Sequence, residues 1–121
     1  MLFRSSSEEG KMDGLGWVNA NTISFDQKRF TESIRIPHMG WEDLEITDKS
    51  PLFINFNEVP RFYFLHSYHF DFINLDYINS FAYYGYRFPA SFHNENIFGV
   101  QFHPEKSHVF GMQLLHNFSE F

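Results

Sequence analysis

The chain has 121 residues, which is enough for one modest domain and too little for two. Aromatic side chains make up 21% of it, with 17 Phe, 6 Tyr and 2 Trp, which excludes intrinsic disorder. Part of this aromatic surface is expected to face a partner. The formal charge of −6 argues against nucleic-acid phosphates as the main ligand. The absence of Cys excludes disulfides, thiolate metal sites and a cysteine nucleophile within the chain.

No apolar run reaches the roughly 18 residues that a membrane-spanning helix needs, and the first 15 residues are too polar for a signal peptide. We therefore expect a cytoplasmic protein that binds neither membrane nor nucleic acid. Residues 1–3 are apolar and a polar stretch follows at once, so they resemble the end of a helix whose start is missing, or a short natural start. The Ser and Glu of residues 5–9 are expected to form a solvated loop, or to hold a substrate ammonium group near a helix end.

Short strands are expected through most of the chain. Residues 14–20 and 22–25 are β-prone runs separated by turn-favouring Asn side chains. Residues 35–41 follow, and their Pro keeps this segment out of the interior of a central strand. Residues 42–46 end in polar–apolar alternation, and residues 48–51 are expected to form a turn.

The clearest strand is predicted over residues 61–70 (RFYFLHSYHF), with large side chains on both faces. A strand that is apolar on both faces is usually an interior strand covered on each side. Further strands are expected over residues 81–86, 88–92 and 97–102, with a hairpin turn at residues 94–96 before the last of them.

One helix is expected, from about His108 to Ser119, with Ser107 as its amino-terminal cap. About six strands and a single helix are unbalanced for a self-standing α/β domain, because one helix can cover only one face of a sheet. The apolar residues of this helix are expected to form one broad stripe, made of Val109, Phe110, Met112, Leu114, Leu115 and Phe118.

The strongest chemical signal is GVQFHPEKS, residues 99–107. An apolar strand ends at His103, and Glu105 follows two positions later, on the same side of the strand end. The Glu105 carboxylate can then hydrogen-bond one ring nitrogen of His103 and leave the other as a proton acceptor. This predicts the base and the orienting acid of a nucleophilic triad; a strand-terminal His with an incidental Glu is the competing interpretation. Adding His108 would mix metal-ligand types without a second His pair or Cys, so no metal is expected.

Two other groupings are open to more than one interpretation. Ser67 beside His66 suggests a hydrolase, but strand alternation puts the two on opposite faces, which favours an aromatic core strand with polar tips. Residues 37–41 (PHMGW) contain Trp and Met, which are enriched in interface cores, so this segment is expected either to face a partner or to pack in the core.

Three segments, in this order and spacing, resemble the class I glutamine amidotransferases: PHMGW at residues 37–41, FYFLHSY at residues 62–68 and GVQFHPEKS at residues 99–107. The FHPE segment is typical of the whole family, and the other two narrow the resemblance to the glutaminase subunit of imidazole glycerol-phosphate synthase. The resemblance covers nearly the whole chain. It implies an α/β, flavodoxin-like fold, with residues 1–121 as a partial, carboxy-terminal piece of the domain that is mostly strands with a terminal helix.

The resemblance also implies a reaction. In the family, a Cys thiolate attacks the carboxamide of glutamine, the His passes the proton to the leaving ammonia, and the Glu holds the His. That Cys and the first parallel strands would lie upstream of residue 1. Ammonia then passes to a (β/α)₈-barrel synthase (cyclase) subunit in histidine biosynthesis, and no cofactor is implied. The positions that match are His103 and Glu105 for catalysis, Glu8 (or Glu9, one register away), Ser67 and Tyr68 for the substrate, and His38, Met39, Trp41 and Lys106 for the barrel subunit.

The absent Cys departs from the family and predicts that this chain alone hydrolyses no glutamine. Two alternatives stay open: a short, non-catalytic module that docks on the synthase subunit, and a homologue that feeds ammonia to a surface-polysaccharide pathway. Without upstream strands, residues 61–70 and their neighbours should expose apolar surface and an open sheet edge. The isolated chain is therefore expected to aggregate or to bind a hydrophobic dye.

Overall fold

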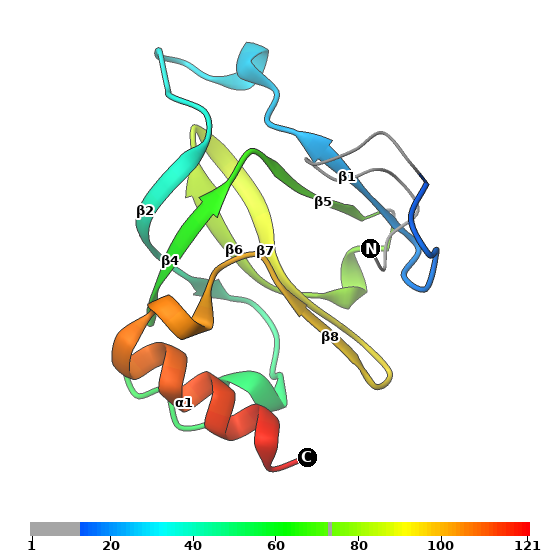
Figure 1. Ribbon diagram of the computed structural model, residues 1–121, viewed down its shortest axis with the longest axis vertical. Helices are drawn as coiled ribbons and strands as arrows, with labels where there is room; N and C mark the ends of the chain where they lie inside the picture. Colours follow the sequence, from blue (N-terminus) through cyan, green and yellow to red (C-terminus); the bar gives the residue numbers. More distant parts are fainter. Residues whose placement is uncertain (1–12, 73) are drawn as a thin grey trace.

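The computed structural model describes residues 13–72 and 74–121, and strands dominate them (Figure 1). The strands form three small antiparallel sheets. Two of them have two strands each, β1 with β5 and β2 with β4, and the third has four strands in the order β3-β6-β7-β8. The strands are β1 (Ala20–Ser24), β2 (His38–Asp43), β3 (Glu45–Ile46), β4 (Arg61–His66), β5 (Tyr68–Phe72), β6 (Ile78–Tyr84), β7 (Tyr86–Asn94) and β8 (Ile97–Val100). The helical elements are α1 (His108–Ser119) and the short 3₁₀ turns η1 (Gln27–Arg29), η2 (Pro51–Phe53), η3 (Leu75–Tyr77) and η4 (Pro104–Lys106).

The aromatic residues account for most of the core. Phe62, Phe64 and Phe88 are fully buried where the β2–β4 pair packs on β6 and β7. Phe25 lies among these rings and meets the Phe88 ring edge-on at 5.4 Å between centroids, a favourable geometry for aromatic pairs. A second, smaller core lies under the β1–β5 pair and contains Val18, Ala20, Phe70, Phe72, Ile78 and Phe92.

The run predicted as one strand over residues 61–70 is two strands that belong to different sheets. The chain leaves the β2–β4 pair at Ser67, whose carbonyl accepts a hydrogen bond from the backbone N–H of Phe25 (3.1 Å), and continues as β5 against β1. Along β4 only one face is buried, while Arg61 and Leu65 point outward and are exposed. The prediction of an unbroken interior strand covered on both sides is therefore wrong.

Three other strand predictions change in detail. The two runs expected over residues 14–20 and 22–25 give a single strand, β1, which begins at Ala20. The aromatic segment 81–86 contains a hairpin turn at Gly85, where φ is +74° and an added Cβ would lie 2.2 Å from the Phe30 ring, so that only glycine fits. The hairpin turn predicted at residues 94–96 is confirmed between β7 and β8.

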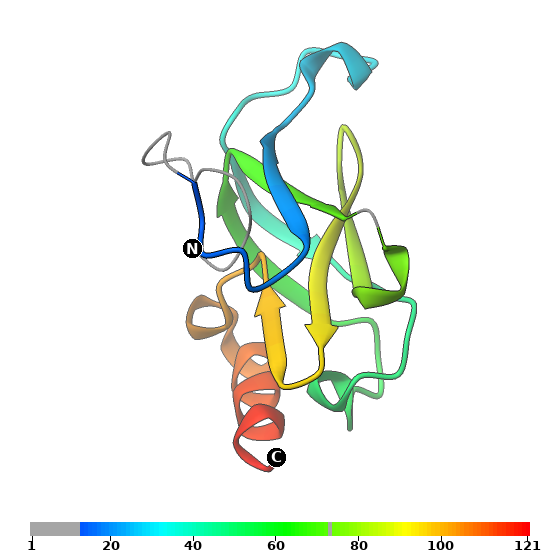
Figure 2. The same cartoon turned by 90° about the vertical axis from the view of Figure 1, so that its right-hand side faces the viewer.

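The terminal helix α1 has the predicted bounds, but its apolar stripe does not pack as a unit. The buried positions are Gly111, Leu114 and Asn117, and Asn117 donates two hydrogen bonds from its amide nitrogen to the carbonyls of Leu52 and Ile54 near η2. Figures 1 and 2 show α1 at one end of the molecule, opposite the segment that carries η1. In residues 13–72 and 74–121, no helix is long and apolar enough to cross a membrane. The outward side of α1 carries four exposed apolar residues, Val109, Met112, Leu115 and Phe118.

This outward apolar side of α1 predicts dye binding by the isolated chain. We expect Val109→Lys combined with Met112→Lys to lower the fluorescence of a bound hydrophobic dye by roughly half, because two of the four apolar side chains are removed. His116→Lys, at an exposed polar position of the same helix, controls for the added charge. A sharp, reversible melt of a monomer that binds no dye would contradict the expectation.

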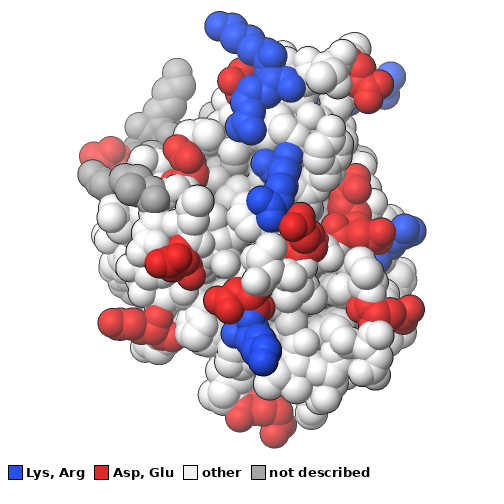
Figure 3. All heavy atoms as spheres, turned by 180° about the vertical axis from the view of Figure 1, so that it is seen from behind, with Lys and Arg blue, Asp and Glu red and all other residues white. Residues whose placement is uncertain are grey.

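The charged side chains on the face seen in Figure 3 are of mixed sign, with Lys and Arg interspersed among Asp and Glu. Exposed ion pairs in the described part of the chain include Arg61 with Asp43 (3.0 Å) and Arg87 with Glu45 (2.9 Å), and such surface pairs contribute little to stability. Among its described residues, the face in Figure 3 therefore carries no continuous basic stripe of the kind that nucleic-acid-binding surfaces have.

Candidate functional site

The candidate catalytic pair consists of His103 and Glu105, and their side chains are hydrogen-bonded. His103 donates from Nδ1 to Oε1 of Glu105 at 2.9 Å, and this bond is the main cause that lowers the pKa of the Glu105 carboxyl below its ordinary value. Because Nδ1 carries the proton, Nε2 is the basic nitrogen of the neutral ring. The His103 side chain is 34% exposed, so a reacting group can reach it. The pair can serve as an oriented general base.

A tight turn holds His103 and Glu105 together. The prediction attributed their contact to the end of a strand, which the structure does not support. Strand β8 ends at Val100, and His103 precedes η4, which opens with Pro104 in its first turn. Because Pro has no N–H to donate and a fixed φ, it starts this turn readily and brings the Glu105 carboxylate back beside the ring. The hydrogen bond is present as predicted, but it comes from a 3₁₀ turn.

Ser107 connects this turn to strand β4. Its buried hydroxyl donates to the carbonyl of His103 (2.6 Å) and accepts from the backbone N–H of Tyr63 (3.0 Å). The backbone N–H of His103 also donates to the carbonyl of Tyr63 at 2.9 Å. Ser107 is the amino-terminal cap residue of α1 as predicted, and its carbonyl accepts from the N–H of Gly111 (3.1 Å), but its hydroxyl caps no helical N–H because it is engaged at His103 and Tyr63. Its position in the GVQFHPEKS segment was the available signal for a role at the pair.

Gly111 lets α1 approach η4 closely. A Cβ at this position would lie 1.8 Å from the carbonyl oxygen of Pro104, far inside any van der Waals contact. The backbone of α1 therefore presses directly on the turn that carries Glu105.

Two of the predicted substrate residues lie in another part of the structure than the catalytic pair. Ser67 and Tyr68 lie at the junction of β4 and β5 and line, with Phe25 and Ile36 among others, a surface hollow of about 610 Å³. The junction is four residues along the chain from Tyr63, or roughly 13 Å in extended backbone, and His103 does not line the hollow. Glu8 and Glu9 lie outside the described residues.

The residues predicted to face a partner divide between two faces of β2. Met39 is 62% exposed and Trp41 39% exposed, and they pair across the strands with Leu65 and Tyr63 of β4. We call these four residues the β2–β4 outer face; Tyr63 places it next to the catalytic pair. Lys106 in η4 is also exposed.

His38 is a correction to the predicted partner surface. Its side chain is 1% exposed and turns into the core, because neighbouring residues of a strand point to opposite faces and Met39 takes the outer one. Tyr84 of β6 stacks on its ring at 3.9 Å between centroids. In the segment PHMGW, His38 therefore packs in the core, while its neighbours Met39 and Trp41 are exposed.

The metal site considered as an alternative, made of His103, Glu105 and His108, does not form in the described part of the chain. His108, its third proposed ligand, stacks on Trp41 with ring centroids 5.3 Å apart and an interplanar angle of 7°. Among residues 13–72 and 74–121, no group of three or more His, Asp or Glu side chains is arranged to hold a metal ion.

Comparison with known proteins gives a consistent result. The family model described as glutamine amidotransferase class-I matches residues 15–120. The chain is 48% identical over 119 residues to the imidazole glycerol phosphate synthase subunit HisH of Bdellovibrio bacteriovorus, covering 98% of this chain and 58% of that protein. It is 42% identical to the protein of the same name from Leptospira borgpetersenii, with the same coverage. It is 44% identical to HisH 2 of Methanococcus maripaludis, covering 97% of this chain and 56% of that protein. The chain thus spans less than two-thirds of the length of these relatives.

Proposed function

This chain belongs to the class-I glutamine amidotransferase family, and we propose that it supplies the acid–base part of a glutaminase site. The family predicted from the three sequence segments is confirmed, and so is the fold class, an α/β amidotransferase domain of which this part is mostly strands with a terminal helix. The observation that carries the proposal is the hydrogen bond between His103 and Glu105, which leaves Nε2 as a base.

In the proposed reaction, His103 moves protons and Glu105 keeps its ring in position. A thiolate adds to the carboxamide carbon of glutamine, the C–N bond breaks, and Nε2–H of the imidazolium protonates the departing ammonia. His103 then takes a proton from the water that cleaves the thioester, releasing glutamate. Glu105 stabilises the imidazolium in both steps. The sulfur is not in this chain, which has no Cys, and must come from another stretch of polypeptide.

We further propose that the β2–β4 outer face meets a synthase subunit that uses the ammonia. The relatives are named as subunits of imidazole glycerol phosphate synthase, which supports ammonia transfer to a cyclase of histidine biosynthesis. Met39 and Trp41 are the kinds of exposed apolar side chain that form interface hot spots, and the face adjoins the catalytic pair through Tyr63. Lys106 borders the same pair and is the proposed charged contact.

The test supplies the missing sulfur. Residues 1–121 are fused to the part of the Bdellovibrio relative that they do not cover, in place of the part that they match, and glutamate release is measured with the cyclase subunit present. We expect the fused domain to hydrolyse glutamine and the 121-residue chain alone to release none. Steady glutamate release by the pure chain, lost on His103→Ala, would contradict the need for a thiol. An inactive fusion that still binds the cyclase would favour the non-catalytic docking module.

A further inference from the structure

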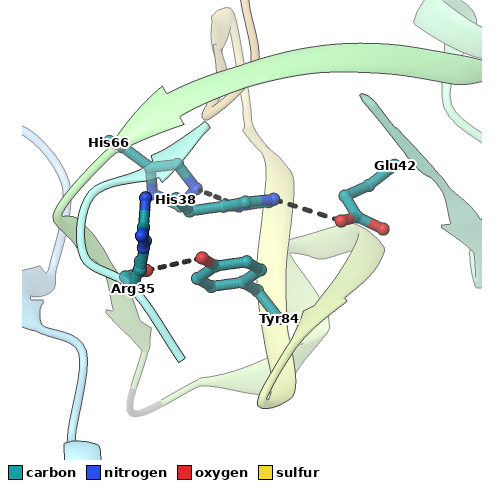
Figure 4. Close-up of polar contacts among 5 residues, drawn as sticks. All are labelled: Arg35, His38, Glu42, His66 and Tyr84. Carbon is teal, nitrogen blue, oxygen red and sulfur yellow. Dashed lines mark hydrogen bonds and ion pairs between the residues drawn. The ribbon is translucent and has the colours of Figure 1, made fainter. Parts of the chain in front are cut away.

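A row of three hydrogen-bonded side chains crosses the core behind the β2–β4 outer face (Figure 4). His38 contacts Oε1 of Glu42 through Nε2 at 3.3 Å and Nε2 of His66 through Nδ1 at 3.0 Å. The other nitrogen of His66, Nδ1, contacts the backbone carbonyl of Tyr68 at 2.7 Å. We call Glu42, His38 and His66 the relay. Both rings are at least 97% buried, whereas the Glu42 side chain is 35% exposed, so the relay reaches solvent at its carboxylate end.

The three hydrogen bonds fix how many protons the relay holds. The carbonyl of Tyr68 can only accept, so Nδ1 of His66 must carry a proton. Each of the other two contacts also needs one proton between its two heavy atoms. Two neutral rings supply only two protons, so the third resides on Glu42 or makes one ring an imidazolium. In every fully bonded arrangement the three side chains together have zero net charge, which is the state that a buried cluster favours.

The relay joins strand β2 to the place where the chain passes from one sheet to another. Glu42 and His38 are on β2, His66 ends β4, and the carbonyl of Tyr68 opens β5. Hydrogen bonds from two parts of the chain act at this junction, in addition to the pairing of Tyr68 with Ser24 in the β1–β5 sheet. One comes from His66, and the other runs from the Phe25 N–H to the carbonyl of Ser67. Losing the proton next to Glu42 would therefore disturb the row that holds Tyr68 in place.

The charged and titratable groups around the relay act mainly on its carboxylate end. Burial raises the pKa of Glu42 above its ordinary value; Asp43 of β2 raises it further, and Arg61 of β4 lowers it. Burial lowers the pKa of His38 to about 3, with His66 as the second cause. Both directions favour a neutral pair, with the proton on the carboxyl and the ring uncharged.

Two other polar side chains near the relay form their hydrogen bonds with groups that do not belong to it. Tyr84 of β6 stacks on His38 and donates its hydroxyl proton to the carbonyl of Arg35. His69 of β5 contacts the hydroxyl of Tyr86 through Nε2 at 2.7 Å, on the far side of Phe25.

We propose that Glu42, His38 and His66 act as a positioning relay that shares one proton and fixes the Ser67–Tyr68 junction. That the junction positions a bound substrate rests on the proposed function; the relay itself does not. As pH rises and the pair of Glu42 and His38 loses its proton, carboxylate and ring nitrogen become two facing acceptors and their bond is lost. The raised pKa of Glu42 gives the sign, because stability from that proton is present at low pH and declines as pH rises through the folded-state pKa. The lowered pKa of His38 has the opposite effect on stability. The stability that comes from keeping this ring neutral is lost as pH falls from about 6.5 towards about 3.

Backbone hydrogen exchange of the 121-residue chain, read by mass spectrometry in a peptide spanning residues 66–72, tests the relay. Glu42→Gln keeps a donor for His38 that cannot ionise, and Glu42→Ala removes it. Glu45→Gln, at an exposed carboxylate of the neighbouring strand β3, is the matched control. At pH values below the folded-state pKa of Glu42 we expect wild type, E42Q and E45Q to exchange alike and E42A about tenfold faster, the effect of one lost buried hydrogen bond. After correction for intrinsic rates, wild type should approach E42A as pH rises through that folded-state pKa, while E42Q stays flat.

Three results would overturn the relay. They are an E42A that exchanges like E45Q, an E42Q that exchanges as fast as E42A, and a wild-type profile that stays parallel to E42Q over the whole pH range in which the chain is folded. Ring C2–H exchange of His38, read in the wild-type digest, keeps the test decisive if E42A fails to fold: a titration step near the ordinary His pKa of about 6.5 overturns a buried neutral ring. None of these readouts uses glutamine, so their failure is distinct from failure of the glutaminase proposal.

Discussion

Replacing His103 by Ala in the fused, glutamine-hydrolysing domain is expected to lower the rate of glutamate release by about 10³- to 10⁴-fold. The ring supplies both proton transfers, to the departing ammonia and from the attacking water, and no other titratable ring is hydrogen-bonded to Glu105 in the described part of the chain. Initial rates of glutamate release at saturating glutamine measure the effect. His116→Ala, which removes an exposed ring from α1, should leave the rate unchanged.

Glu105→Gln tests whether the acid acts through the ring. An amide keeps the size of the side chain but can donate to Nδ1, so the ring can adopt the tautomer that has no base at Nε2. We expect a loss of about 10²-fold or more, and the analogous loss in a serine-protease triad is larger. Retention of most activity by His103→Ala would remove both residues from the proposed chemistry, and retention by Glu105→Gln would remove Glu105.

The site was predictable where its signal is local. His103 and Glu105 are two residues apart, with a Pro between them that starts the turn, so their contact follows from a short piece of chain. The bounds of α1 and the hairpin turn before β8 are local in the same sense. The role of Ser107 beside the catalytic pair was not predictable from local sequence, because its hydroxyl bonds the backbone of Tyr63, which is 44 residues away in sequence.

The predictions that failed depended on distant partners. Residues 61–70 are uniformly β-prone, and nothing in that run marks Ser67 as the break; the break is made by Phe25, which takes the Ser67 carbonyl into another pairing. In PHMGW, alternation along a strand places neighbouring side chains on opposite faces, but it does not tell which face is buried. Hydrophobicity does not identify the buried face either, because the apolar side chains of this segment are on the exposed one. Burial of His38 becomes favourable only with His66 and Glu42 in place.

The apolar stripe of α1 failed for a related reason. Gly111 and Asn117, which carry little or no apolar side chain, form the contact face because each fits a specific backbone feature. Gly111 lies against the carbonyl of Pro104, and Asn117 satisfies two carbonyls near η2. A hydrophobicity pattern cannot register either contact. Of the predicted stripe, Leu114 is buried and Phe110 packs against the core, whereas Val109, Met112, Leu115 and Phe118 are left exposed.

Gly111→Ala is the substitution that should most directly link the packing of α1 to the catalytic pair. Helix propensity alone favours Ala over Gly by about 1 kcal/mol, so a neutral site would gain stability. Here the new methyl would meet a backbone oxygen that cannot rotate away, at 1.8 Å. Overpacking of this kind costs about 1–3 kcal/mol or more, and we expect a net loss of about 2 kcal/mol in the free energy of unfolding. Pulse proteolysis across a urea gradient at low protein concentration measures it.

The same substitution should reach His103, because relief of the clash requires η4 or the start of α1 to move. Ser107 lies at that start, and its two hydrogen bonds tie the turn to Tyr63, so a shift loosens the bond between His103 and Glu105. The pKa of Glu105, lowered mainly by that bond, should then rise towards its ordinary value, which ¹³C titration of the carboxyl would follow. Met112→Ala is the control, because it also introduces Ala into α1, at the next residue and on the exposed side of the helix. It should change neither the free energy of unfolding nor the titration of Glu105. A Gly111→Ala chain as stable as wild type, with the Glu105 titration unmoved, would show that α1 does not set the geometry of the pair.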